Sequence, residues 1–170
     1  DVAPSRGLGD VYKRQIINKD TGMLNKTDHF AYVIGYPDGT VHPNGQITRA
    51  EVATIFFRLL KDEVRDGAFT TSNTYSDVAY GKWYNNPIST MSALGIITGY
   101  PDGTFKPNKP ITRAEFAAIA ARFDETQSGK SATFSDVIGH WAAKEIGIAY
   151  ANEWIKGYPL SLIHISEPTR

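Results

Sequence analysis

The chain repeats its own sequence, and this constrains the fold most, because a repeated unit must bury its apolar face against its neighbours. Residues 35–51 read GYPDGTVHPNGQITRAE and residues 99–115 read GYPDGTFKPNKPITRAE, with 13 of 17 aligned positions identical. A TYSDV segment at residues 74–78 returns as TFSDV at residues 133–137, and a tryptophan follows each one. The sequence therefore predicts an array of units of about 58–64 residues.

Three units fit into the chain, and they are not equivalent. The first has LNKTDHFAYV at residues 24–33 in place of a Ser-Asp-Val…Trp segment. The third contains the Ser-Asp-Val…Trp segment, but it stops before a complete turn or a second helix start. The expected boundaries are residues 16–66 for the atypical first unit, 67–130 for the second and 131–159 for the truncated third.

The two ends of the chain are related to each other through DNA. Residues 160–170 read LSLIHISEPTR, and the reverse complement of one back-translation encodes SRGLGDVYKRQ, which is the sequence of residues 5–15. One DNA segment in two orientations resembles a translated sequencing adapter. We therefore expect residues 1–15 and 160–170 to be adapter-like artefacts, and we leave them out of the predicted fold.

Capping signals predict where the second helix of a unit begins. Thr48 with Glu51, and Thr112 with Glu115, fit the S/T-x-x-E capping box, in which each side chain satisfies a free backbone N–H of the partner residue. Apolar residues follow each box at helical spacing, so we expect these two helices to pack together centrally. The preceding Gly-Tyr-Pro-Asp-Gly-Thr sequence predicts a tight turn, with proline at its second position and glycine at positive φ.

The first helix of the second unit is predicted from its ends. Asn86 is the expected N-cap, Pro87 the first helical residue and Gly95 the C-terminal stop. An apolar stripe should face the core, formed by Ile88, Met91 and Leu94.

Composition excludes several classes of function. The chain has 18 Lys plus Arg against 18 Asp plus Glu, so it lacks the basic excess of a nucleic-acid or membrane-surface protein. It has no Cys and no apolar run of the ~18–20 residues that span a membrane. The Asp-Gly pairs do not fit a calcium-binding loop. We expect no metal and no cofactor, because metal-ligand spacing is also lacking at His29, His42 and His140.

The ordered recurrence of aromatic-Ser-Asp-Val…Trp, Gly-Tyr-Pro-Asp-Gly-Thr and Ile-Thr-Arg-Ala-Glu resembles the S-layer homology family across residues 16–159. The resemblance implies a mainly α fold, with tandem helix–loop–helix repeats packed as a pseudo-threefold helix bundle. Projecting turns or short β prongs would extend from the bundle. It also implies a non-covalent anchor at the outer cell surface, mostly of Gram-positive bacteria. Such a module binds secondary cell-wall polysaccharide, often pyruvylated, and tethers a surface-layer protein or exoenzyme.

The expected ligand-binding residues follow from the family motifs. Arg49 and Arg113 lie in the first turn of a helix, where the dipole favours an anion and an Arg fork suits a carboxylate. The alternative for each arginine is an ion pair with a nearby acid. The four capping residues, in contrast, are expected to be structural: Thr48, Glu51, Thr112 and Glu115.

The remaining candidates have two interpretations each. Asp77 and Asp136 could contact ligand in a groove or cap a local turn. Trp83 and Trp141 could offer faces to sugar rings or belong to the core. The turn tyrosines complete the candidate set: Tyr36 and Tyr100.

Three classes of function compete. The first is the polysaccharide-binding anchor, and the second is a structural protein–protein module that contacts neighbouring surface-layer subunits. The third, an enzyme, is disfavoured, because a glycosidase needs two carboxylates about 5–10 Å apart in a cleft. Every recurrent acid in this chain has a local structural role to explain it. Neither nucleic acid nor membrane insertion is expected.

Overall fold

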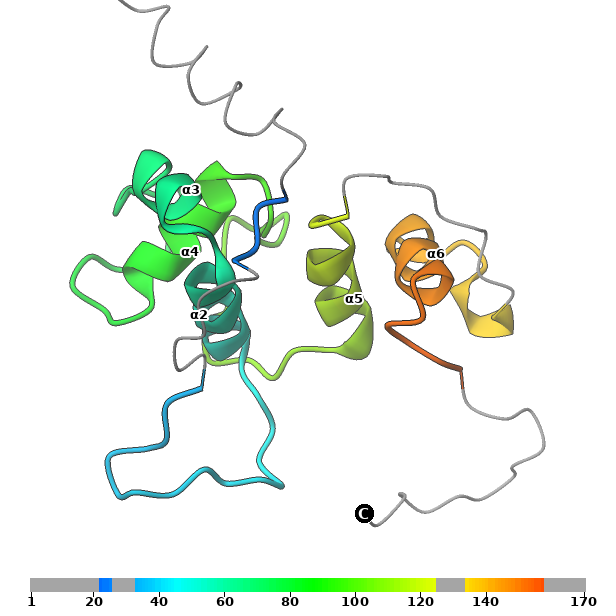
Figure 1. The fold of residues 1–170 in the computed structure, drawn as a ribbon, viewed down its shortest axis with the longest axis horizontal. Helices are drawn as coiled ribbons and strands as arrows, with labels where there is room; N and C mark the ends of the chain where they lie inside the picture. Colours follow the sequence, from blue (N-terminus) through cyan, green and yellow to red (C-terminus); the bar gives the residue numbers. More distant parts are fainter. Residues whose placement is uncertain (1–21, 26–32, 125–133, 158–170) are drawn as a thin grey trace, which may run out of the picture.

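The computed structural model describes residues 22–25, 33–124 and 134–157. Five α-helices and one 3₁₀ turn lie in these ranges (Figure 1). In chain order they are α2 (Arg49–Leu59), α3 (Asp62–Gly67), α4 (Asn85–Ala93), α5 (Arg113–Ala121), η1 (Ser135–Val137) and α6 (Ala143–Ala151). The adapter-like ends lie outside the described residues.

The mainly α expectation is confirmed, and the expectation of short β prongs is not. The described ranges hold two isolated bridges, between Leu24 and Leu60 and between Thr48 and Pro110, but no strand. In the turn of the first unit, the arms exchange one backbone bond close to the tip, from Tyr36 N to Thr40 O at 2.8 Å. One backbone hydrogen bond does not make a β-ladder, so neither arm of this turn is a β-strand. The pseudo-threefold bundle remains a prediction.

Both capping boxes form as the sequence predicts. Thr48 and Thr112 have extended backbones, with φ −86° and ψ 162° in the first and φ −83° and ψ 159° in the second. The Glu51 carboxylate accepts the Thr48 N–H at 2.7 Å, and Glu115 accepts the Thr112 N–H at 2.9 Å. Two sequence-local contacts therefore determine where α2 and α5 begin.

The first helix of the second unit begins earlier than predicted. Its N-cap is Tyr84, without a side-chain cap, and Asn86 lies inside the helix, where its Oδ1 accepts the Thr90 hydroxyl at 3.2 Å. The predicted stop is confirmed. Gly95 has φ +72°, and the N–H groups of residues 95 and 96 donate to Ser92 O and Met91 O, which is a Schellman ending.

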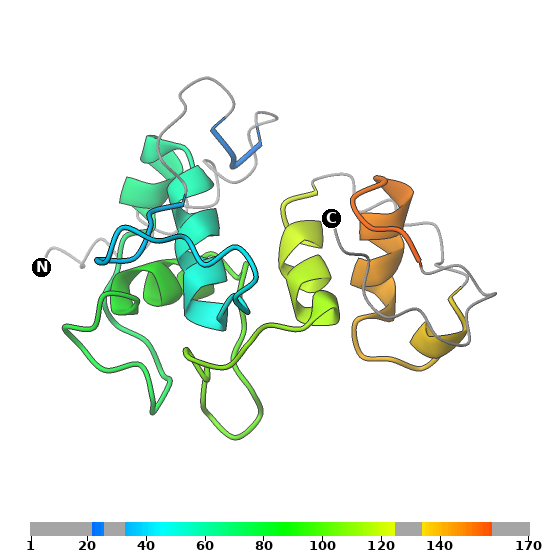
Figure 2. The ribbon, with the colours of Figure 1, turned by 90° about the horizontal axis from the view of Figure 1, so that it is seen from below.

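Each first helix packs against the second helix of the unit before it. α4 lies against α2, and α6 lies against α5 in the same manner (Figures 1 and 2). Of the predicted stripe, Ile88 and Met91 of α4 are fully buried, and Leu94, the C-cap residue, is partly buried against the same core. Aromatic rings link the two second helices, because the Phe56 ring of α2 lies 5.6 Å from the Phe116 ring of α5 and stacks on Phe123, just after α5, at 5.1 Å between centroids. The units therefore share their cores.

Two glycines are required by a close approach to an aromatic ring. A Cβ on Gly99 would lie 2.4 Å from the Tyr75 ring, and a Cβ on Gly157 would lie 2.3 Å from the Phe134 ring. These are equivalent positions in two units. The aromatic side chain of the Ser-Asp-Val segment thus rests directly on the backbone that leads into the next turn.

We predict that Gly99→Ala lowers the free energy of unfolding by about 2 kcal/mol, because the new methyl group forces Tyr75 or the turn to move. Urea unfolding followed by circular dichroism measures this change. The exposed Ser72→Ala variant serves as the control and should stay within about 0.5 kcal/mol of wild type. A Gly99→Ala variant as stable as the control would contradict the close packing.

Candidate functional site

Arg49 forms a buried connection between the first and second units. Only 6% of its surface is exposed, although it is the first residue of α2. Its Nε donates to Phe105 O at 2.8 Å and its Nη2 to Thr98 O at 3.0 Å. Its Nη1 meets Glu115 Oε1 at 3.1 Å, in an ion pair between side chains that are both largely buried.

Aromatic rings complete the surroundings of the Arg49 guanidinium. Its central carbon lies 4.7 Å from the Tyr100 ring centroid and 4.5 Å from that of Phe105. The planar cation is therefore held by three hydrogen bonds and two ring faces of its own chain. Of the two predicted roles, the structure places Arg49 in an ion pair, and that pair is inside the protein.

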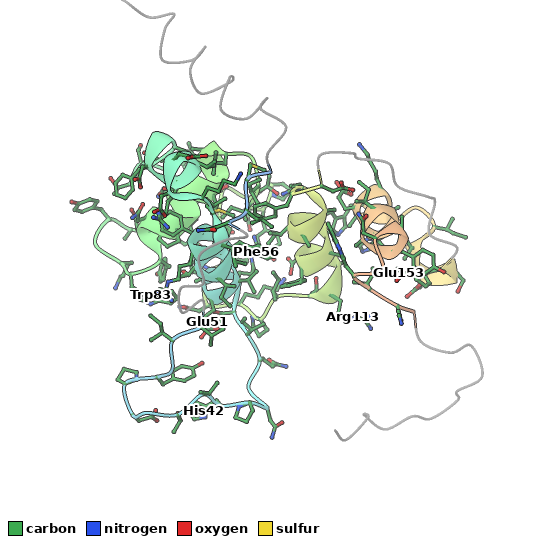
Figure 3. All side chains as sticks on the ribbon, in the orientation of Figure 1. His42, Glu51, Phe56, Trp83, Arg113 and Glu153 are labelled. Atoms are coloured by element: carbon green, nitrogen blue, oxygen red, sulfur yellow. The ribbon has the colours of Figure 1, made fainter. Side chains whose placement is uncertain are left out.

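Arg113 occupies the equivalent position at the start of α5. Its Nη2 donates to Lys156 O at 3.1 Å, which repeats the contact of Arg49 with Thr98 O one unit later. Arg113 differs from Arg49 in exposure, since its side chain reaches solvent (Figure 3). The Arg-to-backbone contact is thus a repeated feature of the fold.

The capping glutamates are held as anions. Burial of the Glu115 carboxyl opposes ionisation, but hydrogen bonds from the Thr112 N–H and the Tyr100 hydroxyl, and the Arg49 charge, outweigh it and lower its pKa. At Glu51, burial is likewise outweighed by Thr48 and by the Tyr36 hydroxyl, which donates at 3.1 Å. Tyr36 and Tyr100 therefore each connect their turn to the following helix, through a hydrogen bond to its capping glutamate.

The two Ser-Asp-Val aspartates have different surroundings. Asp77 accepts the backbone N–H groups of Phe105 and Lys106, at 2.8 and 2.7 Å. This is a cap on the turn of its own unit, 28 residues away, rather than the local cap that was one predicted alternative. Asp136 is exposed, and its carboxylate has no hydrogen-bond partner among the residues described.

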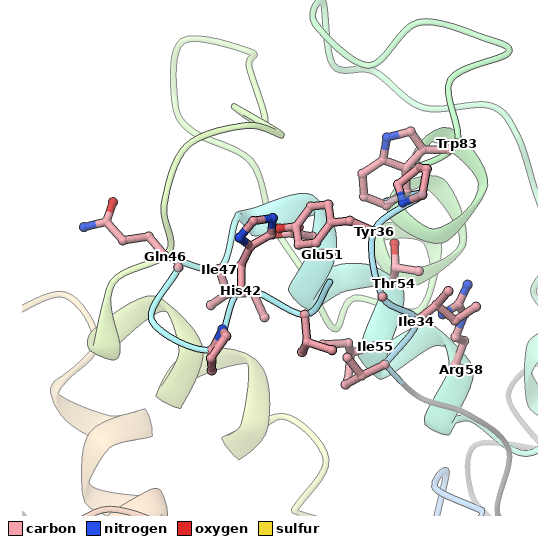
Figure 4. Close-up of a pocket in the computed structure, with 16 residues that line it drawn as sticks. Ile34, Tyr36, His42, Gln46, Ile47, Glu51, Thr54, Ile55, Arg58 and Trp83 are labelled. Atoms are coloured by element: carbon pink, nitrogen blue, oxygen red, sulfur yellow. The ribbon is translucent and has the colours of Figure 1, made fainter. Parts of the chain in front are cut away.

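The predicted tryptophans are on the surface and not in the core. Trp83 and Trp141 are both exposed by more than half. Trp83, Tyr36 and Glu51 line one cavity of about 630 Å³ beside the turn of the first unit (Figure 4). The structure thus brings three of the predicted residues together, whereas Arg49, Asp77 and Asp136 lie outside this lining.

The cationic side chains near Tyr36 and Tyr100 were not predicted from the sequence. Arg58 lines the cavity of Trp83 and Tyr36 and is half-buried. In the second unit, Lys109 Nζ donates to the Tyr100 hydroxyl at 3.0 Å, and Lys106 Nζ lies 4.5 Å from the Tyr100 ring centroid. The sequence did contain a signal for Arg58, because an arginine, Arg122, stands at the equivalent position of the second unit.

Neither a metal-binding cluster nor a membrane-spanning helix lies in the described residues. They contain no group of three or more His, Asp or Glu side chains that could hold a metal ion. No helix in those ranges has the length and apolar character needed to cross a membrane. The candidate binding site in these ranges is therefore the cavity lined by the aromatic Trp83 and Tyr36 and the cationic Arg58.

Comparison with known proteins identifies relatives of the repeats. The S-layer homology domain matches residues 31–53, 74–117 and 133–168. Cell surface glycoprotein 1 of Acetivibrio thermocellus is 42% identical over 144 residues, covering 78% of this chain and 6% of that protein. A cellulosome-anchoring protein of the same organism is 39% identical over 139 residues, covering 78% and 31%.

A third relative carries an enzyme's name. An amylopullulanase of Thermoanaerobacterium thermosulfurigenes is 38% identical over 139 residues, covering 75% of this chain and 7% of that protein. The chain spans less than a third of each of these three relatives.

We predict that Arg49→Ala costs about 3–5 kcal/mol of unfolding free energy, because it leaves Glu115 buried and uncompensated. Arg113→Ala is the matched variant at the equivalent position and should cost less, since that side chain is exposed. Chemical denaturation of both variants measures the difference. Equal losses of unfolding free energy in the two variants would show that burial of the Arg49–Glu115 pair does not contribute to the effect of the substitution.

We predict that Glu115→Gln flattens the acid dependence of stability. Because the folded-state pKa of Glu115 is lowered, its contribution is complete above the ordinary value of 4.5. The contribution is lost as the pH falls through the lowered pKa. Urea unfolding between about pH 7 and pH 2.5 tests this, with the exposed Glu63→Gln as control. The idea fails if Glu115→Gln and wild type lose stability in parallel.

Proposed function

Because the chain belongs to the S-layer homology domain family, we propose that it is a non-covalent anchor that binds a polysaccharide of the bacterial cell wall. The family and the cell-surface relatives support a location at the cell surface. As an anchor, the module would tether a larger surface-layer protein or exoenzyme. The cellulosome-anchoring relative supports this part of the proposal by its name.

The observation that carries the proposal is the cavity beside Trp83. Sugar rings present flat C–H faces that pack on aromatic rings, and Trp83 and Tyr36 supply two such rings. Arg58 contributes a permanent positive charge to the lining of this cavity, and Thr54 contributes a hydroxyl group. An apolar wall with a few polar groups is the usual composition of a small-ligand site.

The Arg58 cation selects the class of polysaccharide. A guanidinium binds a carboxylate through two parallel hydrogen bonds, so the proposed ligand is an acidic polymer, such as one bearing ketal-linked pyruvate. Lys109 beside Tyr100 provides a second cationic position one unit further along, whereas Lys106 beside the same ring is paired with Asp102 at 3.1 Å. Two weak contacts on one polymer reinforce each other through effective concentration.

A catalytic role has less support. Glu51 and Glu115 are each held by a helix cap and a tyrosine hydroxyl, and their pKa values are lowered. A general acid in a glycosidase needs the opposite shift, which keeps the proton at neutral pH. The amylopullulanase name belongs to a protein of which this chain spans 7%, so we assign hydrolysis to other parts of that relative.

We predict that Trp83→Ala and Arg58→Ala each weaken cosedimentation with Gram-positive cell walls by about tenfold, the equivalent of about 1.4 kcal/mol. The controls are Trp154→Ala and Arg65→Ala, which remove the same side chains outside the cavity. Walls stripped of secondary polysaccharide should bind no variant. Binding that survives stripping would sink the proposal and favour a protein or peptidoglycan partner.

A further inference from the structure

His42 stands in the turn of the first unit where Lys106 stands in the turn of the second. The two turns align residue by residue, as GYPDGTVHP at residues 35–43 and GYPDGTFKP at residues 99–107. Both basic residues have a left-handed backbone, with φ 48° at His42 and φ 58° at Lys106. Lysine carries its charge throughout the neutral range, whereas histidine changes its charge between about pH 5 and pH 8. The same position of the repeat is therefore permanently charged in one unit and titratable in the other.

The lysine of the second unit has two partners within its own turn. Lys106 Nζ lies 3.1 Å from Asp102 Oδ2, in an ion pair between residues four apart. The same Nζ lies 4.5 Å from the Tyr100 ring centroid. An aspartate and a tyrosine of the turn thus hold the cation.

The histidine of the first unit meets the same two partners. His42 Nε2 lies 3.9 Å from Asp38 Oδ2, and both side chains are exposed. The His42 ring meets the Tyr36 ring edge-on, with centroids 4.8 Å apart. All three residues belong to one turn and the contacts repeat in the second unit, so this arrangement is a property of the turn itself.

Asp38 keeps its negative charge while His42 titrates. The Thr40 hydroxyl and the Thr40 N–H donate to Asp38 Oδ1, at 2.7 and 3.0 Å, and these hydrogen bonds lower the pKa of the Asp38 carboxyl. Asp102 in the second unit is balanced by Lys106 throughout the neutral range. Asp38 is balanced only when the His42 imidazole is protonated.

His42 lines the cavity of about 630 Å³ together with the groups proposed to bind polysaccharide (Figure 4). The other titratable or charged side chains of this lining, among the residues described, are Tyr36, Glu51 and Arg58. Tyr36 stays neutral, because its hydrogen bond to Glu51 raises its pKa. When His42 is neutral, the Asp38 and Glu51 carboxylates therefore face the single positive charge of Arg58. Protonation of His42 supplies the second positive charge.

We propose that protonation of His42 strengthens the binding of an acidic polysaccharide in this cavity. Protonated His42 pairs with Asp38, which removes the repulsion between that carboxylate and the carboxylates of the polymer and leaves Arg58 to bind them. The affinity is highest at mildly acidic pH and falls as the pH rises through the histidine range. The inference rests on the proposed function, since the acidic polymer is its ligand.

The test is cosedimentation with Gram-positive cell walls at low ionic strength, at about pH 5.5 and about pH 8. We expect wild type to bind about threefold more tightly at the lower pH, since the charges involved are exposed and each contributes modestly. Each variant is compared with wild type at the same pH, so that titration of the wall itself does not enter the comparison. Circular dichroism checks that every variant folds.

Two substitutions of His42 fix its charge. His42→Lys copies the second unit, where lysine occupies the same backbone conformation, and should bind at both pH values as tightly as wild type does at the lower pH. His42→Asn has no charge and tolerates a positive φ, so it should bind at both pH values as weakly as wild type does at the higher pH.

A substitution of the partner separates this mechanism from a general effect of charge. Asp38→Asn keeps a side-chain oxygen for the Thr40 N–H but removes the negative charge, so it should bind tightly at both pH values. His140→Asn changes the other histidine of the described residues, which lies outside the cavity, and should keep the pH dependence of wild type.

The outcomes distinguish this inference from the proposed anchor. A His42→Asn variant that keeps the pH dependence of wild type would overturn the role of His42. So would equal affinities of His42→Asn and His42→Lys at both pH values. Failure of wild type to bind walls at either pH, or binding that survives removal of the secondary polysaccharide, would contradict the proposed anchor instead.

Discussion

The ion pair between Arg49 and Glu115 is the contact on which the other interactions between the units depend. Glu115 caps α5, accepts the Tyr100 hydroxyl that ties the turn of the second unit to this helix, and neutralises Arg49 from the first unit. Arg49 in turn holds the carbonyl groups of Thr98 and Phe105. A buried pair is stable only when such additional hydrogen bonds satisfy both charges. Cap, loop and neighbouring unit are therefore coupled through one carboxylate.

Features that depend on nearby residues could be predicted from the sequence. The capping boxes, the Gly95 ending and the Ile88 stripe each involve partners within a few residues, and all formed as expected. The sequence could not decide between the two roles offered for Arg49, because Glu115 is 66 residues away and burial decides whether an arginine binds ligand or its own chain. Asp77 is a similar case, since its partners are 28 and 29 residues away. Asn86 was assigned wrongly because a loop asparagine and a first-turn asparagine look alike in sequence.

The candidate site shows how a motif and a binding surface can be separate. The Thr-Arg-Ala-Glu motif supplies the framework and places Glu51 in the cavity lining, whereas the exposed Trp83 and the half-buried Arg58 come from outside the motif. Apolar groups that gather in one exposed patch, rather than standing singly, are typical of interaction sites. Trp83 and Tyr36 lie where two consecutive units meet, so a ligand there would contact both units at once.

The packing of each first helix on the preceding unit has a mechanical consequence. In the proposed anchor, tension would act along the chain. Because α4 belongs to the core of the first unit through α2, and α6 packs on α5, no single unit can be pulled out without breaking into its neighbour. Separating one unit from the next therefore requires the helix contacts of a common core to break together.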